Sequence, residues 1–320
     1  MYRHSRRFGV ESRKKQRRKK DMAVCIAAMY GKAKDAARGI VCAMDWQITD
    51  SHTSFASDTQ IKFMPVSNLV SVMGAGDMML FQSLMQRIHD VTRADTNDSL
   101  SVEDIADLYI ATQIAVAKEW KEHNILQPQF GVSWNEFFER QKELSDAYIT
   151  QLLQATGTTA YPYASDAIIL GFDNPDDPNN EQMRIFKITN GYKDDHSNSG
   201  FAVIGEGDSI AAVEFQLARY NRFWDASRTA FLAFVAMKRS ESIVSVGKST
   251  TLGIHDRKGW SVMPEKIKEG FDVAYGTLVK ARFGSETEAY DNAKTIVEKN
   301  SKDLRPLSRA SSGKKGMRKH

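Results

Sequence analysis

One carboxylate is conspicuous among the residues that could do chemistry, because of its position. Asp45 directly follows an apolar run at 40–44, and a matching run at 24–29 precedes it across a polar turn that contains Gly31. Two apolar runs around such a turn predict two paired β-strands. Judged by residue type alone, Asp45 and the nearby Lys62 favour an ordinary ion pair over catalysis.

The sequence contains no recognisable metal or phosphate motif. The glycines of "GAGDMM", which begin at Gly74, lack the Lys-Ser/Thr pair of a phosphate loop and favour a tight turn into a helix. There is no G-x-S-x-G, no C-x-x-C and no H-x-x-x-H. The histidines are scattered along the chain: His4, His52, His89, His123, His196, His255 and His320. We therefore expect neither a metal nor a cofactor.

Two acidic features have simple structural explanations. Asp173, Asp176 and Asp177 lie together in "GFDNPDDPNNEQ", where a hydrated hairpin loop is favoured over a calcium loop. Glu206 lies between two glycines at a strand-to-helix turn. Attraction to the positive end of the helix is enough to explain a carboxylate there.

The two cysteines indicate the compartment. Cys25 and Cys42 fall on the two strands expected to pair, where small apolar core residues are the simplest interpretation. So few cysteines suit a reducing, cytoplasmic setting without a disulfide framework. No run approaches the roughly 20 apolar residues of a membrane span, so we expect no membrane association.

The charge is divided unevenly along the chain. Residues 1–21 carry +8 and residues 302–320 carry +6, so the net +4 leaves −10 for the residues between them. Basic runs of this kind are typical of solvated tails, and they could also hold a polyanion such as nucleic acid. A further interpretation of the first run is that translation starts at Met22 instead of Met1.

Hydrophobic periodicity predicts blocks of strands separated by pairs of helices. Expected strands are 24–29, 40–44, 68–73, 166–173, 184–189, 201–207 and 250–256. Expected helices begin near Asp77, Ser101, Ser133, Asp208 and Asp225. Ser101 with Asp104, and Ser133 with Glu136, resemble capping boxes. The helix from Ser133 should carry an apolar face of Phe137, Leu144, Tyr148 and Leu152. This order favours two packed sheets with helices outside.

The order of these motifs resembles the proteasome β-subunit-like N-terminal-nucleophile hydrolases. "MAVCIAA…GIVCAMDWQIT…IKFMP…NLVSVMGAGD" resembles the first half of that family, and "AIILGFD…RIFKIT…GFAVIGEG…FLAFVAMKRS" the second half. The resemblance covers roughly residues 22–255. The helical segment at about 102–157 is longer than in a proteasome subunit and resembles the segment found in a bacterial branch of the family. It implies an α+β fold, a four-layer αββα sandwich, in a domain at 22–260. The basic extension 1–21 would precede this domain, and a polar segment at 261–320 would follow it.

The resemblance also assigns residues. In the family, an N-terminal Thr, Ser or Cys attacks an amide with its own α-amine as base, while a Lys and an Asp tune that amine. By motif the Asp is Asp45, the Lys is Lys62, and a later Ser is Ser249. The nucleophile position falls on Ala23, which has no nucleophilic atom, or on Met22. A turn that carries Ser in the family carries Glu206 here, and the Asp that should accompany Ser249 falls near Val246.

Three functions follow from this pattern. The first is a proteasome-like protein without amidase activity, acting as a structural or binding subunit of a homo-oligomer. The second is an active amidase or peptidase after processing, with Cys25 as a nucleophile if cleavage bares it. The third is a polyanion binder that uses residues 1–21 and 302–320.

Overall fold

The computed structural model describes residues 24–31, 38–45, 62–94, 100–158, 161, 164–174, 182–243 and 246–300. The chain divides into two compact units, Met1–Pro264 and Glu265–His320. Both sheets belong to the first unit. Within the described part of the second unit there is a single long helix, α8 (Glu265–Asn300).

The first sheet is built around the strands that contain Cys25 and Asp45. In the described residues it has five strands, in the order β10-β9-β2-β1-β8, and every neighbouring pair is antiparallel. The strands are β1 (Val24–Tyr30), β2 (Gly39–Asp45), β8 (Phe201–Gly205), β9 (Thr250–Asp256) and β10 (Gly259–Val262). The expected pairing of 24–29 with 40–44 is confirmed, with Ala27 opposite Cys42 and Cys25 opposite Met44.

The second sheet comes from the middle of the chain. Over the described ranges it also has five strands, all antiparallel, in the order β3-β4-β5-β6-β7. They are β3 (Phe63–Pro65), β4 (Val70–Gly76), β5 (Ser165–Asp173), β6 (Gln182–Thr189) and β7 (Tyr192–Asp195). Asp173 ends β5 at the hairpin, as expected, whereas Asp176 and Asp177 lie outside the described residues.

The two sheets pack face to face through alternate residues of their strands. Cys25, Ala27 and Met29 of β1 share one apolar cluster with Ile168 and Leu170 of β5. All seven residues of β1 are buried, because the other face of the strand lies under α7 (Ala226–Ser240). A strand covered on both faces reads as a continuous apolar run instead of an alternating one.

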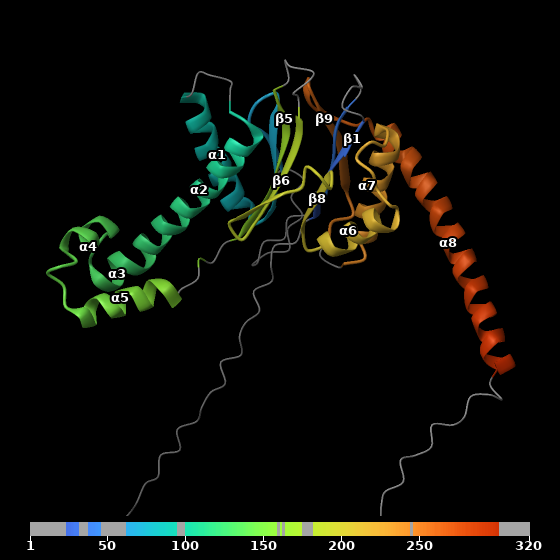
Figure 1. Ribbon diagram of the computed structural model, residues 1–320. Coiled ribbons are helices and arrows are strands. Elements are labelled where there is room, and N and C mark those ends of the chain that lie inside the picture. Colours follow the sequence, from blue (N-terminus) through green and yellow to red (C-terminus); the bar gives the residue numbers. More distant parts are fainter. Residues whose placement is uncertain are drawn as a thin grey trace, which may run out of the picture. The chain divides into compact units, whose positions relative to one another are not determined.

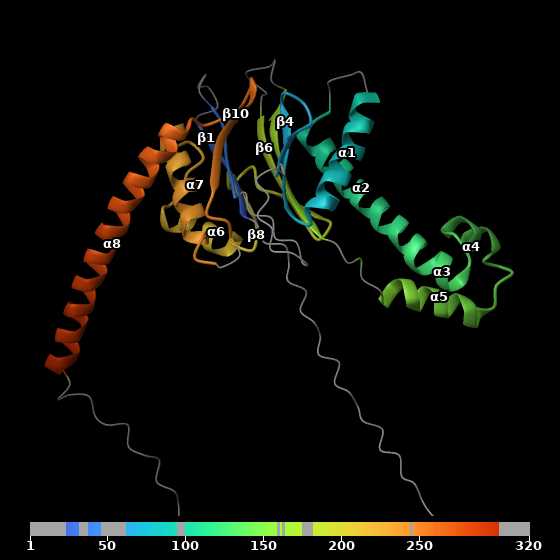
Figure 2. The same cartoon turned by 180° about the vertical axis from the view of Figure 1, so that it is seen from behind.

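Helices lie on the outer face of each sheet (Figure 1). α1 (Met78–Ala94) and α2 (Val102–Lys121) bury Phe81, Leu84 and Tyr109 in a cluster with residues of the second sheet. α6 (Asp208–Leu217) and α7 (Ala226–Ser240) pack together and contact β8, β1 and β2. The reverse view shows the same order of helices and sheets (Figure 2). The mixed α+β class expected from the sequence is confirmed.

The helical segment between β4 and β5 extends beyond the sheet. Only the first half of α2 is buried, at Val102, Ile105, Ala106 and Tyr109. Its far end continues through a π-helical turn (Glu122–Leu126) into α3 (Gln127–Phe130), followed by α4 (Trp134–Arg140) and α5 (Asp146–Thr158). These parts share a separate small core of Leu126, Phe137 and Leu152.

Both predicted capping boxes are confirmed, but one predicted helix is wrong. Ser101 with Asp104 and Ser133 with Glu136 make the reciprocal bonds of the box. The helix from Ser133 ends at Arg140, and a second helix begins at Asp146. Phe137 and Leu152 still meet in one core, because the two short helices fold against each other instead of continuing as one.

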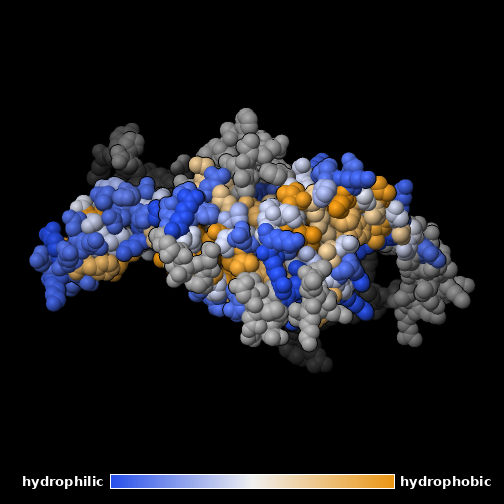
Figure 3. Space-filling view, turned by 90° about the horizontal axis from the view of Figure 1, so that it is seen from above, coloured by the Kyte–Doolittle hydropathy of each residue, from blue (hydrophilic) through white to orange (hydrophobic). Residues whose placement is uncertain are grey.

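Exposed apolar residues are scattered. Seen from above, hydrophobic residues reach the surface in several patches separated by hydrophilic ones (Figure 3). Single large exposed side chains such as Met79, Val213 and Leu217 are ordinary for folded proteins. The polar groups at the ends of the strands are therefore the more informative features.

Candidate functional site

Asp45 ends β2 and is completely buried. Both of its carboxylate oxygens accept hydrogen bonds from described residues. Oδ1 accepts from the backbone N–H of Val24 at 3.1 Å and from Lys62 Nζ at 2.6 Å. Oδ2 accepts from the backbone N–H of Gly247 at 2.8 Å. The carboxylate thereby ties together three segments that are distant in the sequence.

Lys62 precedes β3, so its ion pair with Asp45 joins the two sheets. The side chain of Lys62 is 2% exposed and that of Asp45 is 0% exposed. The carbonyl of Lys62 accepts from the backbone N–H of Gly74, which holds this residue against β4. Removal of one partner from such a buried pair leaves an uncompensated charge, which is strongly destabilising. The short distance between the two charged groups and the burial of both side chains confirm the expected ion pair.

The head of β1 lies directly beside this pair. Val24 pairs with Gly205, and a Cβ added to Gly207 would meet the Val24 side chain at 2.4 Å. Val24 N and Lys62 Nζ bind the same oxygen, so they lie no more than about 6 Å apart. Ala23 and Met22, the nucleophile positions by resemblance, lie outside the described residues.

Glu206 occupies the turn between β8 and α6. Its neighbour Gly205 has a φ of +96°, a conformation that favours glycine, and Gly207 is the N-cap of α6 without a side-chain cap bond. Glu206 is half-buried, and Gly205 pairs with Val24. Glu206 therefore belongs to the same end of the first sheet as Asp45. Its stabilising effect on the helix end stays a prediction.

Ser249 lies just before β9, in the segment whose Gly247 donates to Asp45. Thr250, the next residue, is the register partner of Asp45. The Ser249 side chain is exposed, whereas Val246 is buried. The chain therefore brings Ser249 to the end of the sheet where Asp45 lies, on the solvent side.

Cys25 is the only thiol close to the pair, and its surroundings are those of a core residue. The Sγ atom is buried and donates to the carbonyl of Gly74 at 3.4 Å. Burial raises the pKa of the thiol to about 12; Lys62 lowers it and Asp45 raises it to smaller extents. Cys42 is also buried and free, so the prediction of two apolar core cysteines is confirmed.

The remaining side chains of metal-binding type do not come together among the described residues. Over the described ranges, no group of three or more His, Cys, Asp or Glu side chains is arranged to hold a metal ion. His255 is buried, with Nε2 donating to the carbonyl of Leu69 at 3.0 Å and Nδ1 facing Ser71 Oγ at 3.5 Å. The rings of Phe63 and Phe172 lie against it. None of the described helices is both long and apolar enough to pass through a bilayer.

Sequence reasoning missed two backbone donors of the site. The N–H groups of Val24 and Gly247 complete the coordination of Asp45. Every residue except proline carries an N–H, so its use in a site leaves no signal in the sequence. Comparison with known proteins adds no further assignment: no protein-family model matches the chain, and no curated protein matches it.

Proposed function

We propose that the chain is a proteasome-like protein of the N-terminal-nucleophile hydrolase type that has lost amidase activity. Its core would be the four-layer αββα sandwich of that family, and it would act as a structural or binding subunit of a homo-oligomer. Two facing antiparallel sheets with α1 and α2 outside one and α6 and α7 outside the other support this proposal.

The observation that carries the proposal is the buried Asp45–Lys62 pair at the head of β1. An N-terminal nucleophile needs a cation next to its α-amine, so that the amine stays neutral enough to act as a base. Lys62 Nζ and Val24 N share Asp45 Oδ1, so the ammonium lies beside the backbone nitrogen at the head of β1.

The residue before Val24 is Ala23, whose methyl side chain cannot attack a carbonyl. Asp45 and Lys62 alone can position an amine and a bound peptide, but they cannot form an acyl-enzyme. Cys25 does not replace the missing group, because its thiol is buried between the sheets and its pKa is raised to about 12. The framework is therefore expected to bind without cleaving.

Restoring the nucleophile tests this proposal. A chain that begins at residue 23 with Ala23→Thr, made behind an initiator Met that aminopeptidase removes, is compared with the same truncation carrying Ala23. Each is incubated with a peptide β-lactone and with fluorogenic peptide amides, and intact mass reports the adduct. We expect an adduct and amide hydrolysis only with Ala23→Thr.

Two further variants assign the effect to the site. Lys62→Met in the Ala23→Thr background should remove the adduct, whereas Lys258→Met, on an exposed turn, should leave it unchanged. Circular dichroism and thermal unfolding establish that each variant is folded. Amide hydrolysis by the Ala23 chain, lost on Cys25→Ala, would replace the proposal with an active thiol hydrolase.

The remaining expectations have their own tests. Sedimentation of the full chain would show a single monomeric species if the homo-oligomer is wrong. Deletion of residues 1–21 and 302–320, which lie outside the described residues, should abolish any binding to nucleic acid and its dependence on salt if the basic tails hold a polyanion.

A further inference from the structure

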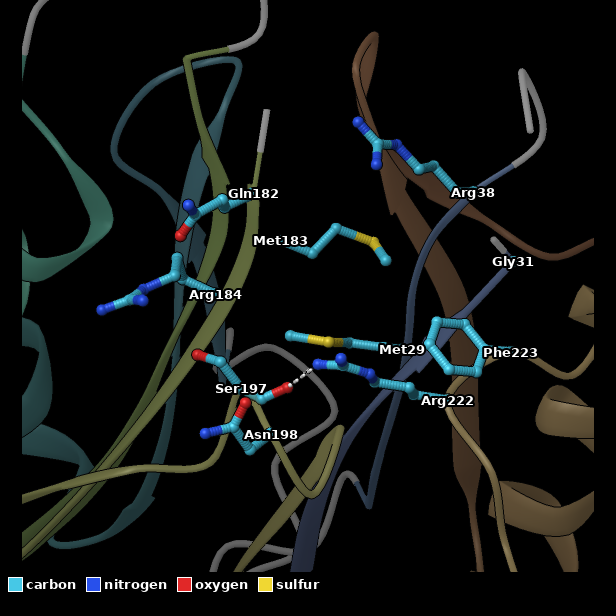
Figure 4. Close-up of a pocket in the computed structure, with 10 residues that line it drawn as sticks. All are labelled: Met29, Gly31, Arg38, Gln182, Met183, Arg184, Ser197, Asn198, Arg222 and Phe223. Carbon is cyan, nitrogen blue, oxygen red and sulfur yellow. Dashed lines mark hydrogen bonds between the residues drawn. The ribbon is translucent and has the colours of Figure 1, made fainter. Parts of the chain in front are cut away.

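A second feature lies at the opposite end of β1 from Asp45. A pocket of about 290 Å3 opens there, next to Met29 near the end of β1 and Arg38 just before β2 (Figure 4). Its other walls are the start of β6, the turn after β7 and the loop between α6 and α7. None of the residues considered for catalysis lines this pocket, and its argument does not depend on Ala23.

The walls are fixed by hydrogen bonds between segments. Met29 N donates to the carbonyl of Gly200, and Gly31 N donates to the carbonyl of Trp224, both at 2.8 Å. The Tyr220 hydroxyl donates to the carbonyl of Met29 as well. Sites for small molecules are usually formed before the ligand arrives, and these bonds give the pocket that property.

The lining combines an apolar middle with two cationic sides. Met29 and Met183 come from facing sheets and point toward each other in the middle of the pocket, with Arg38 on one side and Arg222 on the other (Figure 4). Arg184 also lines the pocket, but its guanidinium points away, toward Asp173 and Asp195 at 3.8 and 3.5 Å. Among the described lining residues there is no Asp or Glu.

The two cations differ in how they are held. The guanidinium of Arg222 donates to the carbonyl of Ser197 at 2.9 Å and lies 5.1 Å from the centre of the Phe223 ring. Arg38 is buried, and burial, followed by repulsion from Arg257, lowers the pKa of its guanidinium. A guanidinium has five N–H donors, so each arginine can donate to an anion in the pocket in addition to the partners that it already has.

We propose that this pocket binds a small aliphatic dicarboxylate. Its carboxylates accept from Arg38 and Arg222, and its methylene chain lies on the Met29 and Met183 thioethers. Arginine forks match carboxylates, and methionine adapts to flexible apolar chains. The volume lies near the lower limit of the roughly 300–1,000 Å3 typical of small-molecule sites, so a compact metabolite fits better than a peptide.

The arrangement favours two carboxylates over one phosphate. A phosphate is usually held by donors that converge on a single centre, often at a helix N-terminus. Here Arg38 and Arg222 stand on opposite sides of two apolar side chains (Figure 4). Gln182 and Asn198 are exposed polar lining residues that can bind the remaining carboxylate oxygens.

Calorimetric titration of the full chain at low ionic strength tests the proposal, because salt screens exposed charges. The probes are succinate, glutarate, adipate and pimelate, with hexanoate and 1,6-hexanediol as analogues that have one carboxylate or none. We expect one chain length to bind best, hexanoate to bind about tenfold more weakly, and the diol not to bind.

Variants assign the binding to the pocket. Arg38→Gln and Arg222→Gln should each weaken the best dicarboxylate by about tenfold or more. Arg140→Gln serves as the matched control, because Arg140 is exposed on α4, outside the pocket lining. Met183→Glu places a carboxylate inside the pocket, where it competes with the ligand for the arginines. It should therefore abolish binding although both arginines are kept.

Three results would overturn the proposal. One is the absence of binding by every dicarboxylate at millimolar concentration. Another is equal affinity in Arg38→Gln, Met183→Glu and Arg140→Gln, with thermal unfolding showing that all three are folded. The third is displacement of the best dicarboxylate by inorganic phosphate at lower concentration, which would assign the pocket to phosphate.

Discussion

The two ends of β1 treat charge in opposite ways. At the Val24 end, Asp45 accepts from a buried ammonium and from two backbone N–H groups of the described residues. At the other end, Arg38 and Arg222 line a pocket between the sheets that no carboxylate of the described residues lines. β1 therefore has two different ends. At the Val24 end, which we call the matched end, Asp45 and Lys62 form a buried ion pair. At the Met29 end, which we call the positive end, Arg38 and Arg222 line a pocket.

The difference separates two uses of buried charge. A matched pair such as Asp45 and Lys62 fills its space and fixes the segments that donate to it, so its main effect is on stability. Arginines that line a pocket contribute less to packing, so their substitution should mainly change the affinity of the pocket for a ligand. The same fold therefore offers two sites whose variants should differ in which property they change.

Breaking the matched end should have the largest effect. Asp45→Ala leaves the Lys62 ammonium buried without its carboxylate, so we expect the free energy of unfolding to fall by about 3–5 kcal/mol. Urea unfolding followed by circular dichroism measures it. The double variant Asp45→Asn with Lys62→Met removes both charges and should recover much of the loss. A loss below about 1 kcal/mol for Asp45→Ala would mean that the buried ion pair between Asp45 and Lys62 does not form in solution.

Acidification should lower the free energy of unfolding through His255, which lies at the positive end of the first sheet. His255 pairs with Ile40 near the start of β2, and burial lowers its pKa. The unfolded chain then binds more protons than the folded one, so stability falls as pH drops from about 6.5 toward the folded-state pKa, by at most about 1.4 kcal/mol per pH unit. His255→Gln should flatten this slope, and His123→Gln, in the helical segment, should not. Equal slopes in both would contradict the assignment to His255.

Loosening the wall of the pocket should have a smaller effect. Tyr220→Phe removes the hydroxyl that donates to the carbonyls of Met29 and Gly200. We expect about 0.5–1.5 kcal/mol of stability to be lost. Hydrogen exchange should show faster opening at the end of β1 than at Val24. Uniform acceleration along the whole strand would show that the two ends do not open separately.

The smallest effect on stability should come from Arg38→Met. Arg38 lines a pocket instead of filling packed space, so a neutral side chain of similar length should change the free energy of unfolding by less than about 1 kcal/mol. Lys62→Met, measured in the same way, should cost several times more. A larger loss for Arg38→Met than for Lys62→Met would reverse the comparison between the two ends.

The sequence predicted the matched end much better than the positive one. The resemblance to a known family named Asp45 and Lys62 together, but the sequence alone did not decide whether the two side chains meet; the structure shows that they do. Arg38 and Arg222 are far apart in the chain, and neither belongs to a recognisable motif. Only the sheet pairing and the loop before α7 bring them to one pocket.

Element length explains most of the remaining differences. Long strands and capped helices were predicted close to their bounds, because periodicity and caps act over many residues. β3, β7 and β10 have three or four residues each, too few for a period to be seen. The break between Arg140 and Asp146 was missed because the apolar face continues through it, although Ser145 accepts from the N–H of Tyr148 and so marks the start of the second helix.

The half-buried α2 makes the helical segment a lever. Its last buried residue is Tyr109, and the helix then continues through the π-helical turn to Phe130, braced against α1 by the Arg87–Glu119 pair. Over about 32 Å, a tilt of about 10° at Tyr109 moves Phe130 by about 5 Å. A small rearrangement of the sheet surface would therefore displace the far end of this segment, which carries its own core, by about one helical turn.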